Sequence, residues 1–459
     1  MNYQAFIQSK TSKAVFGGFE VKDMNHRLHD WQADVVSLAC KRGRFGGFED
    51  CGLGKSFQQL ECARQIVKHG GVSDPVLILA PLAVAKQTQR EAEKFGIDVD
   101  VHVCRSQADV KSGINVINYE RIHTIDPHKF SAVILDEGSI IKSIDGKIKT
   151  QVIEAFKNTR YRQTWTATPA PNDAMEFGNQ SEFCGVMSRP EMLAKYFIHD
   201  GGETSKWRLK GHAHQPFWDW MAGWSIMVQS PGDIGYSDDG YVLPDLNVID
   251  HVVESQAHGN YLFVVESGSL ADRRAARKNS MTERIDKVAD LVNESDDPWV
   301  VWCNYNDEST ALANAIPDAN EVTGSMSIEE KEQRLEWFTN GDARVLVTKP
   351  KISGFGLNWQ HCRNTAIFPT DSWEQYYQMV RRFWRFGQTQ PVNVHLVYSE
   401  AEFGVIENIR RKEQQADDLR RGVVNAMRTM MTSAVHGESK QDKQGYDPNL
   451  RMVLPTWMQ

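Results

Sequence analysis

The sequence predicts an α/β protein with two doubly wound parallel sheets and a helical and loop insertion between them. Short, wholly apolar segments such as 75–80 and 132–135 indicate strands buried on both faces of a sheet. Segments with helical spacing of apolar residues alternate with these strands, which is the pattern of parallel strands joined by crossover helices. The alternation breaks from about residue 176 to 280 and then returns, so two sheets are expected rather than one.

The expected elements follow one another in a regular order. In the first half we expect strands at 75–80, 99–103, 114–117, 132–135 and 162–166, with helices that begin near residue 29, after residue 55 and at 84. In the second half we expect strands at 298–303, 344–348, 365–368 and 392–398, and helices at 329–338, at 372–384 and from about 400 to 431. These elements predict an N-terminal extension at 1–28, a first lobe at 29–180, an aromatic-rich insertion at 181–283, a second lobe at 284–400, a C-terminal helix at 401–436 and a flexible tail at 437–459.

Composition and charge restrict the class of protein. The chain has no run of eighteen apolar residues and no charged-then-apolar start, so we expect no membrane span and no secretory signal. We therefore expect an intracellular, cytoplasmic protein. The formal charge of −8 argues against a histone-like binder but not against nucleic acid, because nucleic-acid binding depends on local basic tracks.

A glycine-rich stretch at 49–56, with the sequence Glu-Asp-Cys-Gly-Leu-Gly-Lys-Ser, precedes a helical pattern. Gly52 and Gly54 would let backbone N–H groups approach phosphate oxygens at the positive end of a helix dipole. Lys55 supplies a charge for the β- and γ-phosphates, and Ser56 offers a hydroxyl to Mg²⁺. Because Glu49 stands where the general phosphate-loop pattern has a glycine, the stretch alone could also be a tight turn that caps an ordinary helix.

Two further groups of charged residues complete the candidate chemistry. Asp136 and Glu137 follow the apolar strand at 132–135, where an aspartate can hold Mg²⁺ and a glutamate can deprotonate a water. Arg382 and Arg385 are three residues apart and would share a face of the expected helix, from which they could stabilise a γ-phosphate in the transition state. Adjacent surface carboxylates and a solvated arginine-rich helix are the ordinary alternatives. The position of the carboxylates at a strand end, about eighty residues after the phosphate loop, favours roles in Mg²⁺ binding and in activation of a water.

With these residues and several further segments, the chain resembles the superfamily-two nucleic-acid-dependent ATPases. The resemblance is strongest to the SWI/SNF group of DNA translocases, and especially to compact phage-encoded members, and it runs from about residue 31 to 407. The segments that resemble motifs of this family are 30–32, 50–56, 80–91, 117–120, 135–142, 166–172, 322–325, 354–358 and 378–388. Departures from the family pattern are Ser139, Pro171 and Ser353, which replace the usual histidine, glutamine and glycine.

The resemblance implies two RecA-like lobes with ATP and Mg²⁺ bound in the cleft between them. It implies nucleotide contacts from Gln32, Gly52, Leu53, Gly54, Lys55, Ser56, Gly356 and Gln388, and Mg²⁺ contacts from Ser56 and Asp136. It implies catalytic roles for Glu137, Lys55, Arg382 and Arg385. It implies coupling or DNA contacts for Pro81, Lys86, Tyr119, Thr166, Thr168, Asn358 and Trp373.

The expected function is therefore an ATP-dependent DNA translocase or helicase, with duplex DNA favoured over single-stranded DNA and RNA. An RNA-dependent helicase of the same superfamily and the motor subunit of a restriction-type system are the alternatives. A non-enzymatic DNA-binding module is disfavoured because the charged residues needed for hydrolysis are all present. For the tryptophans of the insertion, core packing is the ordinary interpretation. For Arg273, Arg274 and Arg277, a solvated helix face is the ordinary interpretation, and binding of a partner or of DNA is the alternative.

Overall fold

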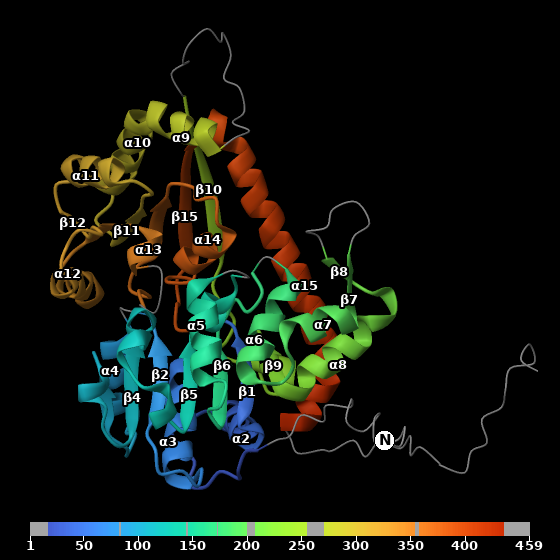
Figure 1. Cartoon of the computed structure of the whole chain (residues 1–459). Coiled ribbons are helices and arrows are strands. Elements are labelled where there is room, and N and C mark those ends of the chain that lie inside the picture. Colours follow the sequence, from blue (N-terminus) through green and yellow to red (C-terminus); the bar gives the residue numbers. More distant parts are fainter. Residues whose placement is uncertain are drawn as a thin grey trace, which may run out of the picture.

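A computed structural model describes residues 17–81, 84–143, 146–171, 173–199, 207–254, 270–353 and 358–435. Two parallel sheets, each covered by helices, form two lobes that face one another across the middle of the molecule (Figure 1). The tail expected at 437–459 and most of the extension expected at 1–28 lie outside the described residues. Even the long C-terminal helix carries too many charges to cross a bilayer, and no other described helix is long and apolar enough to do so.

Lobe 1 is built on a seven-stranded sheet in which all strand pairs are parallel, in the order β3-β4-β2-β5-β6-β1-β9. The central strands are fully buried, as their apolar sequences predicted. The strands are β1 (Arg44–Glu49), β2 (Val76–Ala80), β3 (Val101–Val103), β4 (Ile114–Asn118), β5 (Ala132–Asp136), β6 (Tyr161–Trp165) and β9 (Ser225–Val228). The helices are α2 (Asp30–Arg42), α3 (Lys55–His69), α4 (Ala85–Phe95), α5 (Lys147–Phe156), α6 (Phe177–Cys184), α7 (Arg189–Tyr196) and α8 (His214–Trp224).

Lobe 2 is built on a six-stranded parallel sheet in the order β10-β15-β14-β11-β13-β12. The strands are β10 (Leu246–Val253), β11 (Trp299–Trp302), β12 (Ala319–Glu321), β13 (Val345–Thr348), β14 (Asn364–Ile367) and β15 (Val392–Ser399). The helices are α9 (Leu270–Asn279), α10 (Met281–Asn293), α11 (Asn306–Ala315), α12 (Ile328–Asn340), α13 (Pro350–Ser353), α14 (Trp373–Val380) and α15 (Phe403–Val435). The predicted class of two doubly wound α/β lobes is confirmed.

The segment expected as an insertion, 181–283, contributes one strand to each sheet. β9 extends the lobe 1 sheet beyond β1, and β10 extends the lobe 2 sheet beyond β15. A short antiparallel hairpin, β7 (Phe197–His199) with β8 (Trp207–Leu209), stands outside both sheets. Trp218 and Trp224 are buried in the core of lobe 1, so core packing is the role of these aromatic side chains. The predicted domain boundaries remain a prediction.

The basic cluster of the insertion includes one buried side chain. Arg277 on α9 donates to Glu402 at 3.0 Å and pairs with Asp371 at 3.3 Å, inside lobe 2. Arg274 is exposed, and the side chain of Arg273 is outside the described set. The contacts of Arg277 therefore hold α9 against lobe 2, and this arginine is not free to bind DNA or a partner.

The C-terminal helix α15 joins the two lobes. Its first turns pack Val405, Ile406 and Ile409 into the core of lobe 2, and its second half packs Met427 and Met431 into the core of lobe 1. In Figure 1 this helix runs along one side of the molecule from one lobe to the other. One continuous helix is thus anchored in both lobes by apolar side chains.

We expect Met427→Ala to lower the free energy of unfolding by about 2–5 kcal/mol, because it leaves a cavity where α15 meets lobe 1. Thermal and chemical unfolding would measure this change. Asn425→Ala, two residues away and exposed, is the control and should change stability by less than about 0.5 kcal/mol. Equal stability of the two variants would contradict the docking of α15 on lobe 1.

Candidate active site

A cavity of about 230 Å³ lies between the lobes at the carboxyl ends of the lobe 1 strands, where ligands of such sheets bind. Lobe 1 contributes the phosphate loop, the start of α3, residues from α4 and the end of β5. Lobe 2 contributes the segment that follows α14 and a loop before β14. Among the lining residues are Gly52, Gly54, Lys55, Ser56, Glu91, Asp136, Glu137, Asn358, Arg381, Arg382 and Arg385. The structure therefore brings the three predicted groups of charged residues to one place.

The two glycines of the phosphate loop cannot be replaced without strain. Gly52 and Gly54 both adopt the left-handed conformation, with φ of 88° and 85°. A Cβ on Gly52 would lie 2.7 Å from the backbone nitrogen of Phe386, and a Cβ on Gly54 would lie 2.5 Å from Nε2 of Gln32. The loop is therefore packed tightly between lobe 2 and α2, and its backbone shape requires glycine.

Lys55 and Ser56 begin α3 directly after this loop. Nζ of Lys55 donates to the backbone oxygens of Glu49 and Asp50, at 2.9 Å and 2.8 Å. The Lys55 ammonium is thus held over the concave side of the loop, at the positive end of the α3 dipole. The loop, the ammonium and the helix end together make a site for an anion.

The carboxylates at the end of β5 lie opposite the phosphate loop. Nε2 of Gln59 donates to Asp136 Oδ1 at 2.8 Å, and burial, followed by the charge of Glu137, raises the pKa of Asp136 to about 7. Glu137 has φ of 51°, a left-handed conformation that is unfavourable for a residue with a side chain. The hydroxyl of Thr166 donates to Glu137 Oε2 at 3.3 Å. A strained backbone and a fixed carboxylate are typical of a functional position.

The two predicted arginines line the cavity but do not share a helix face. α14 ends at Val380, and the chain continues in consecutive turns up to Gly387, which has φ of 90°. The expected helix to residue 384 is therefore wrong by one turn. The turns bury Phe383 in lobe 2 and place Arg382 and Arg385 at the wall of the cavity.

The charged side chains that line the cavity come from both lobes. Arg381, Arg382 and Arg385 lie on the lobe 2 side, where burial lowers the pKa of each, to about 9 for Arg381 and about 10 for Arg382. Nε of Arg385 is buried and has no hydrogen-bond partner among the described residues. Buried cations that are only partly satisfied favour a polyanion.

The lobe 1 side of the cavity offers oxygen donors to a metal ion. Ser56, Glu91 and Asp136 all line it, and hydroxyl and carboxylate oxygens suit a hard divalent cation. Burial raises the pKa of Glu91, and its carboxylate accepts from Gln87 at 2.8 Å. A nucleoside triphosphate with a divalent cation, which combines several negative charges with a metal, fits this divided arrangement.

Two family models match the chain. An SNF2-related domain matches residues 37–187, and a helicase conserved C-terminal domain matches residues 283–387. These two matches fall on the two lobes that meet at the cavity. The chain is a superfamily-two, SWI/SNF-like helicase-type ATPase.

Relatives of this ATPase include a phage protein and a chromatin remodeller. "Putative protein p41" of Acyrthosiphon pisum secondary endosymbiont phage 1 is 23% identical over 80% of this chain and 91% of its own. The SWI/SNF chromatin-remodeling complex subunit snf22 of Schizosaccharomyces pombe is 21% identical over 90% of this chain but only 28% of its own length. The fold resembles that of S. cerevisiae Dbp5 bound to RNA and ADP BeF3, with a TM-score of 0.52, 12% identity, and coverage of 84% of this chain and 89% of that one. The SWI/SNF-like ATPase is thus a nucleic-acid-dependent enzyme that uses a nucleotide with a divalent metal.

Some residues predicted for this ATPase lie behind the cavity rather than in it. Gln32 donates to the backbone oxygen of Leu53 at 2.8 Å and accepts from the backbone of His29, so its amide supports the loop. Gln388 is buried, and its amide donates to backbone oxygens of its own lobe. Tyr119 is buried and donates to the backbone oxygen of Asp136 at 2.7 Å, so its side chain supports the end of β5.

The predicted coupling residues lie along the interface between the lobes. Thr168 donates weakly to Glu374 of lobe 2 at 3.5 Å, and Trp373 packs beside the segment that carries Thr168. Asn358 accepts a hydrogen bond from Arg385. Pro81 is half-buried after β2, whereas Gly356 and the side chain of Lys86 are not among the parts that the structure describes.

Sequence reasoning did not assign Arg381, Gln59 or Glu91 to the site. Glu91 was included only as the last residue of the motif-like segment 80–91. The spacing of Gln87 and Glu91 by four residues on one helix was a signal that both side chains share a face. Gln59 stands one turn after Lys55, which could have placed it near β5. For Arg381 there was no local signal, because its partner lies far away in the sequence.

We expect Glu49→Gln to stabilise the ATPase above pH 7. Glu49 is fully buried, its Oε1 has no partner among the described residues, and burial raises its pKa to about 7. The raised pKa means that the folded state binds the Glu49 proton more tightly than the unfolded chain does. The stability that this proton provides is therefore lost as pH rises through about 7. Glutamine keeps an acceptor for Gln58 and removes the charge.

Melting temperatures between pH 5.5 and 8.5 measure this effect. The gap between Glu49→Gln and the wild type should be largest at pH 8.5 and should shrink towards pH 5.5. Glu93→Gln, on an exposed side chain of α4, is the control and should show no such trend. A gap that grows as pH falls would contradict the assignment of a buried, proton-binding Glu49.

Proposed function

We propose that this protein is an ATP-dependent DNA translocase that hydrolyses ATP with Mg²⁺ and moves along duplex DNA. The observation that carries the proposal is the composite cavity, in which the phosphate loop of one lobe meets the arginines of the other. A site divided in this way is complete only when the lobes are together. Hydrolysis can therefore be linked to a relative movement of the lobes.

Each group of the cavity has a proposed role. The phosphate loop and Lys55 would bind the β- and γ-phosphates, and Ser56 and Asp136 would hold the metal, directly or through its water shell. Bound Mg²⁺ would neutralise the charge that develops on the phosphates. Glu137 would accept a proton from the attacking water, and Thr166 would orient its carboxylate.

Arg382 and Arg385 would stabilise the charge on the transferred phosphoryl group. Arg382 is buried and Arg385 half-buried beside the loop, so their guanidinium groups are partly desolvated and their attraction for a phosphate is strengthened. Asn358 holds Arg385 by a hydrogen bond, which supports a role for this residue in positioning the arginine.

A chain of contacts runs from the proposed base to lobe 2 and supports coupling between hydrolysis and movement. The Thr166 hydroxyl contacts Glu137 and also accepts from the backbone of Thr168 at 3.1 Å. Thr168 reaches Glu374 at the start of α14, and Lys142 of lobe 1 pairs with the same glutamate. A change in the position of Glu137 would thus be transmitted through these contacts to α14. The segment that follows α14 carries Arg382 and Arg385.

DNA is proposed as the track because the SNF2-related match and the relative named as a chromatin-remodelling subunit favour it over RNA. We propose that Pro81, Lys86 and Asn358, from the two lobes, contact the backbone of the nucleic acid. Backbone contacts carry no sequence information, so binding should be salt-sensitive and tolerant of sequence. RNA as the track is the alternative that the assay below separates.

We expect ATP turnover to rise at least about tenfold with duplex DNA over turnover without nucleic acid, and to rise less with single-stranded DNA or RNA. The assay compares the three nucleic acids at low and moderate salt, with Mg²⁺ present and then chelated. Stimulation only by RNA would replace the DNA assignment. An absence of stimulation by any nucleic acid would refute the motor.

We expect Glu137→Gln to lower turnover about 10²- to 10⁴-fold while ATP binding is kept, because the variant loses a base but no phosphate contact. Turnover and binding of a fluorescent ATP analogue measure the two effects. Glu93→Gln is again the control. Normal turnover by Glu137→Gln would show that another group activates the water.

A further inference from the structure

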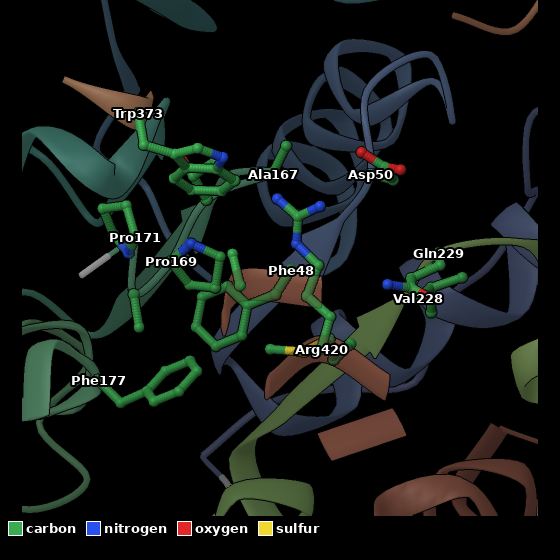
Figure 2. Close-up of a pocket in the computed structure, with 14 residues that line it drawn as sticks. Phe48, Asp50, Ala167, Pro169, Pro171, Phe177, Val228, Gln229, Trp373 and Arg420 are labelled. Carbon is green, nitrogen blue, oxygen red and sulfur yellow. The ribbon is translucent and has the colours of Figure 1, made fainter. Parts of the chain in front are cut away.

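Asp50 lies at the start of the phosphate loop and lines a small cavity of about 30 Å³ (Figure 2). Its backbone N–H donates to the oxygen of Val228 on β9 at 2.9 Å, and its carbonyl accepts from Lys55. Asp50 Oδ1 accepts from the backbone of Cys51 at 2.7 Å. The backbone of Asp50 therefore belongs to lobe 1.

The carboxylate of Asp50 also binds lobe 2. The Tyr377 hydroxyl donates to Asp50 Oδ1, and the guanidinium of Arg381 forms an ion pair with Asp50 Oδ2. The side chains of Arg381 and Asp50 are only 7% and 15% exposed, so both charges are largely removed from water. This pair joins the lobes, at a separation of 331 residues along the chain.

Arg381 also contacts residues of its own lobe. Its Nη1 donates to the Trp384 oxygen at 3.1 Å, and its Nε donates to the Tyr377 hydroxyl at 3.3 Å. The guanidinium lies 4.7 Å from the ring centre of Trp384. The charges of Arg420 and Arg385 lie nearby and repel it. Asp50 is therefore the negative charge that directly pairs with this buried cation.

The ion pair connects the two segments that carry the proposed chemistry. On lobe 1 the Asp50 carbonyl holds the ammonium of Lys55, and on lobe 2 Arg381 directly precedes Arg382. Moving Arg381 away from Asp50 would therefore move the arginines away from the phosphate loop. Arg420 of α15 lies 4.5 Å from the ring centre of Tyr377 and so supports the contact from a third element.

We propose that Asp50, Tyr377 and Arg381 form an interlobe latch that selects the closed arrangement of the cavity. The three are positioning residues, because they act through Lys55, Arg382 and Arg385 and not on the phosphates themselves. The inference rests on the proposed function in that closure is needed for hydrolysis. The latch itself is a property of the lobes and can be measured without turnover.

Charge reversal tests the latch. The variants are Asp50→Arg, Arg381→Asp and the double variant D50R/R381D, in which the pair is restored with opposite polarity. Dyes on cysteines introduced at Lys157 of lobe 1 and Asp307 of lobe 2, both exposed, report the distance between the lobes by energy transfer. Because the native Cys51 is only partly buried, the background carries Cys51→Ser. Arg411→Asp, on the exposed face of α15, is the matched control for reversal of a charge.

We expect each single reversal to widen the interlobe distance and to lower kcat about ten- to a hundredfold, with a smaller change in KM for ATP. We expect D50R/R381D to recover most of the distance and of kcat, while Arg411→Asp stays at the wild-type values. A double variant no closer to the wild type than the worse single variant would overturn the latch. Single reversals that leave the distance unchanged would do the same.

Failure of the latch is distinguishable from failure of the proposed function. If wild-type turnover is stimulated by nucleic acid but the reversals do not change the interlobe distance, the latch is wrong and the motor stands. If the wild type shows no turnover but the distances open and recover as expected, the motor is wrong and the latch stands. Melting temperatures of all variants check that the lobes remain folded.

Discussion

The structure depends on one constraint: Arg381 and Arg382 of lobe 2 are buried, and Arg385 is half-buried, against a phosphate loop that belongs to lobe 1. Burial of a cation is costly unless opposite charge is close, and burial lowers the pKa of both Arg381 and Arg382. The compensating groups come from lobe 1, where Asp50 pairs with Arg381 and the carboxylates after β5 lie across the cavity. Charges of the two lobes therefore compensate one another where the lobes meet.

Other parts of the fold fix the positions of the two lobes relative to each other at this cavity. β9 pairs with β1 and accepts the backbone N–H of Asp50, so the edge of the lobe 1 sheet fixes the entry to the phosphate loop. α15 is anchored by apolar side chains in both cores and places Arg420 beside Tyr377. The contacts from Thr166 to Glu374 form a second connection between the lobes, on the other side of the small cavity. In the proposed mechanism, hydrolysis depends on these interlobe contacts as well as on the residues that line the cavity.

Much of this arrangement follows from local sequence. The wholly apolar strands, the glycine loop before a helix and the carboxylates at a strand end are local patterns, and all three occur where the sequence predicted them. Three features could not be predicted in this way. β10 is largely exposed, and Asn247, Asp250 and His251 interrupt its apolar residues, so it lacks the unbroken apolar run of β2. The end of α14 at Val380 is set by burial of Phe383 in lobe 2, and the pairing of Asp50 with Arg381 joins residues 331 positions apart.

The central claim is that hydrolysis at the interlobe cavity drives movement along duplex DNA. Displacement of a triplex-forming strand from the end of a duplex track tests this claim most directly. The account predicts that the third strand is released only with hydrolysable ATP, after a lag that grows with the length of duplex between the free end and the triplex. Turnover stimulated by duplex DNA, without release of the third strand at any track length, would contradict it.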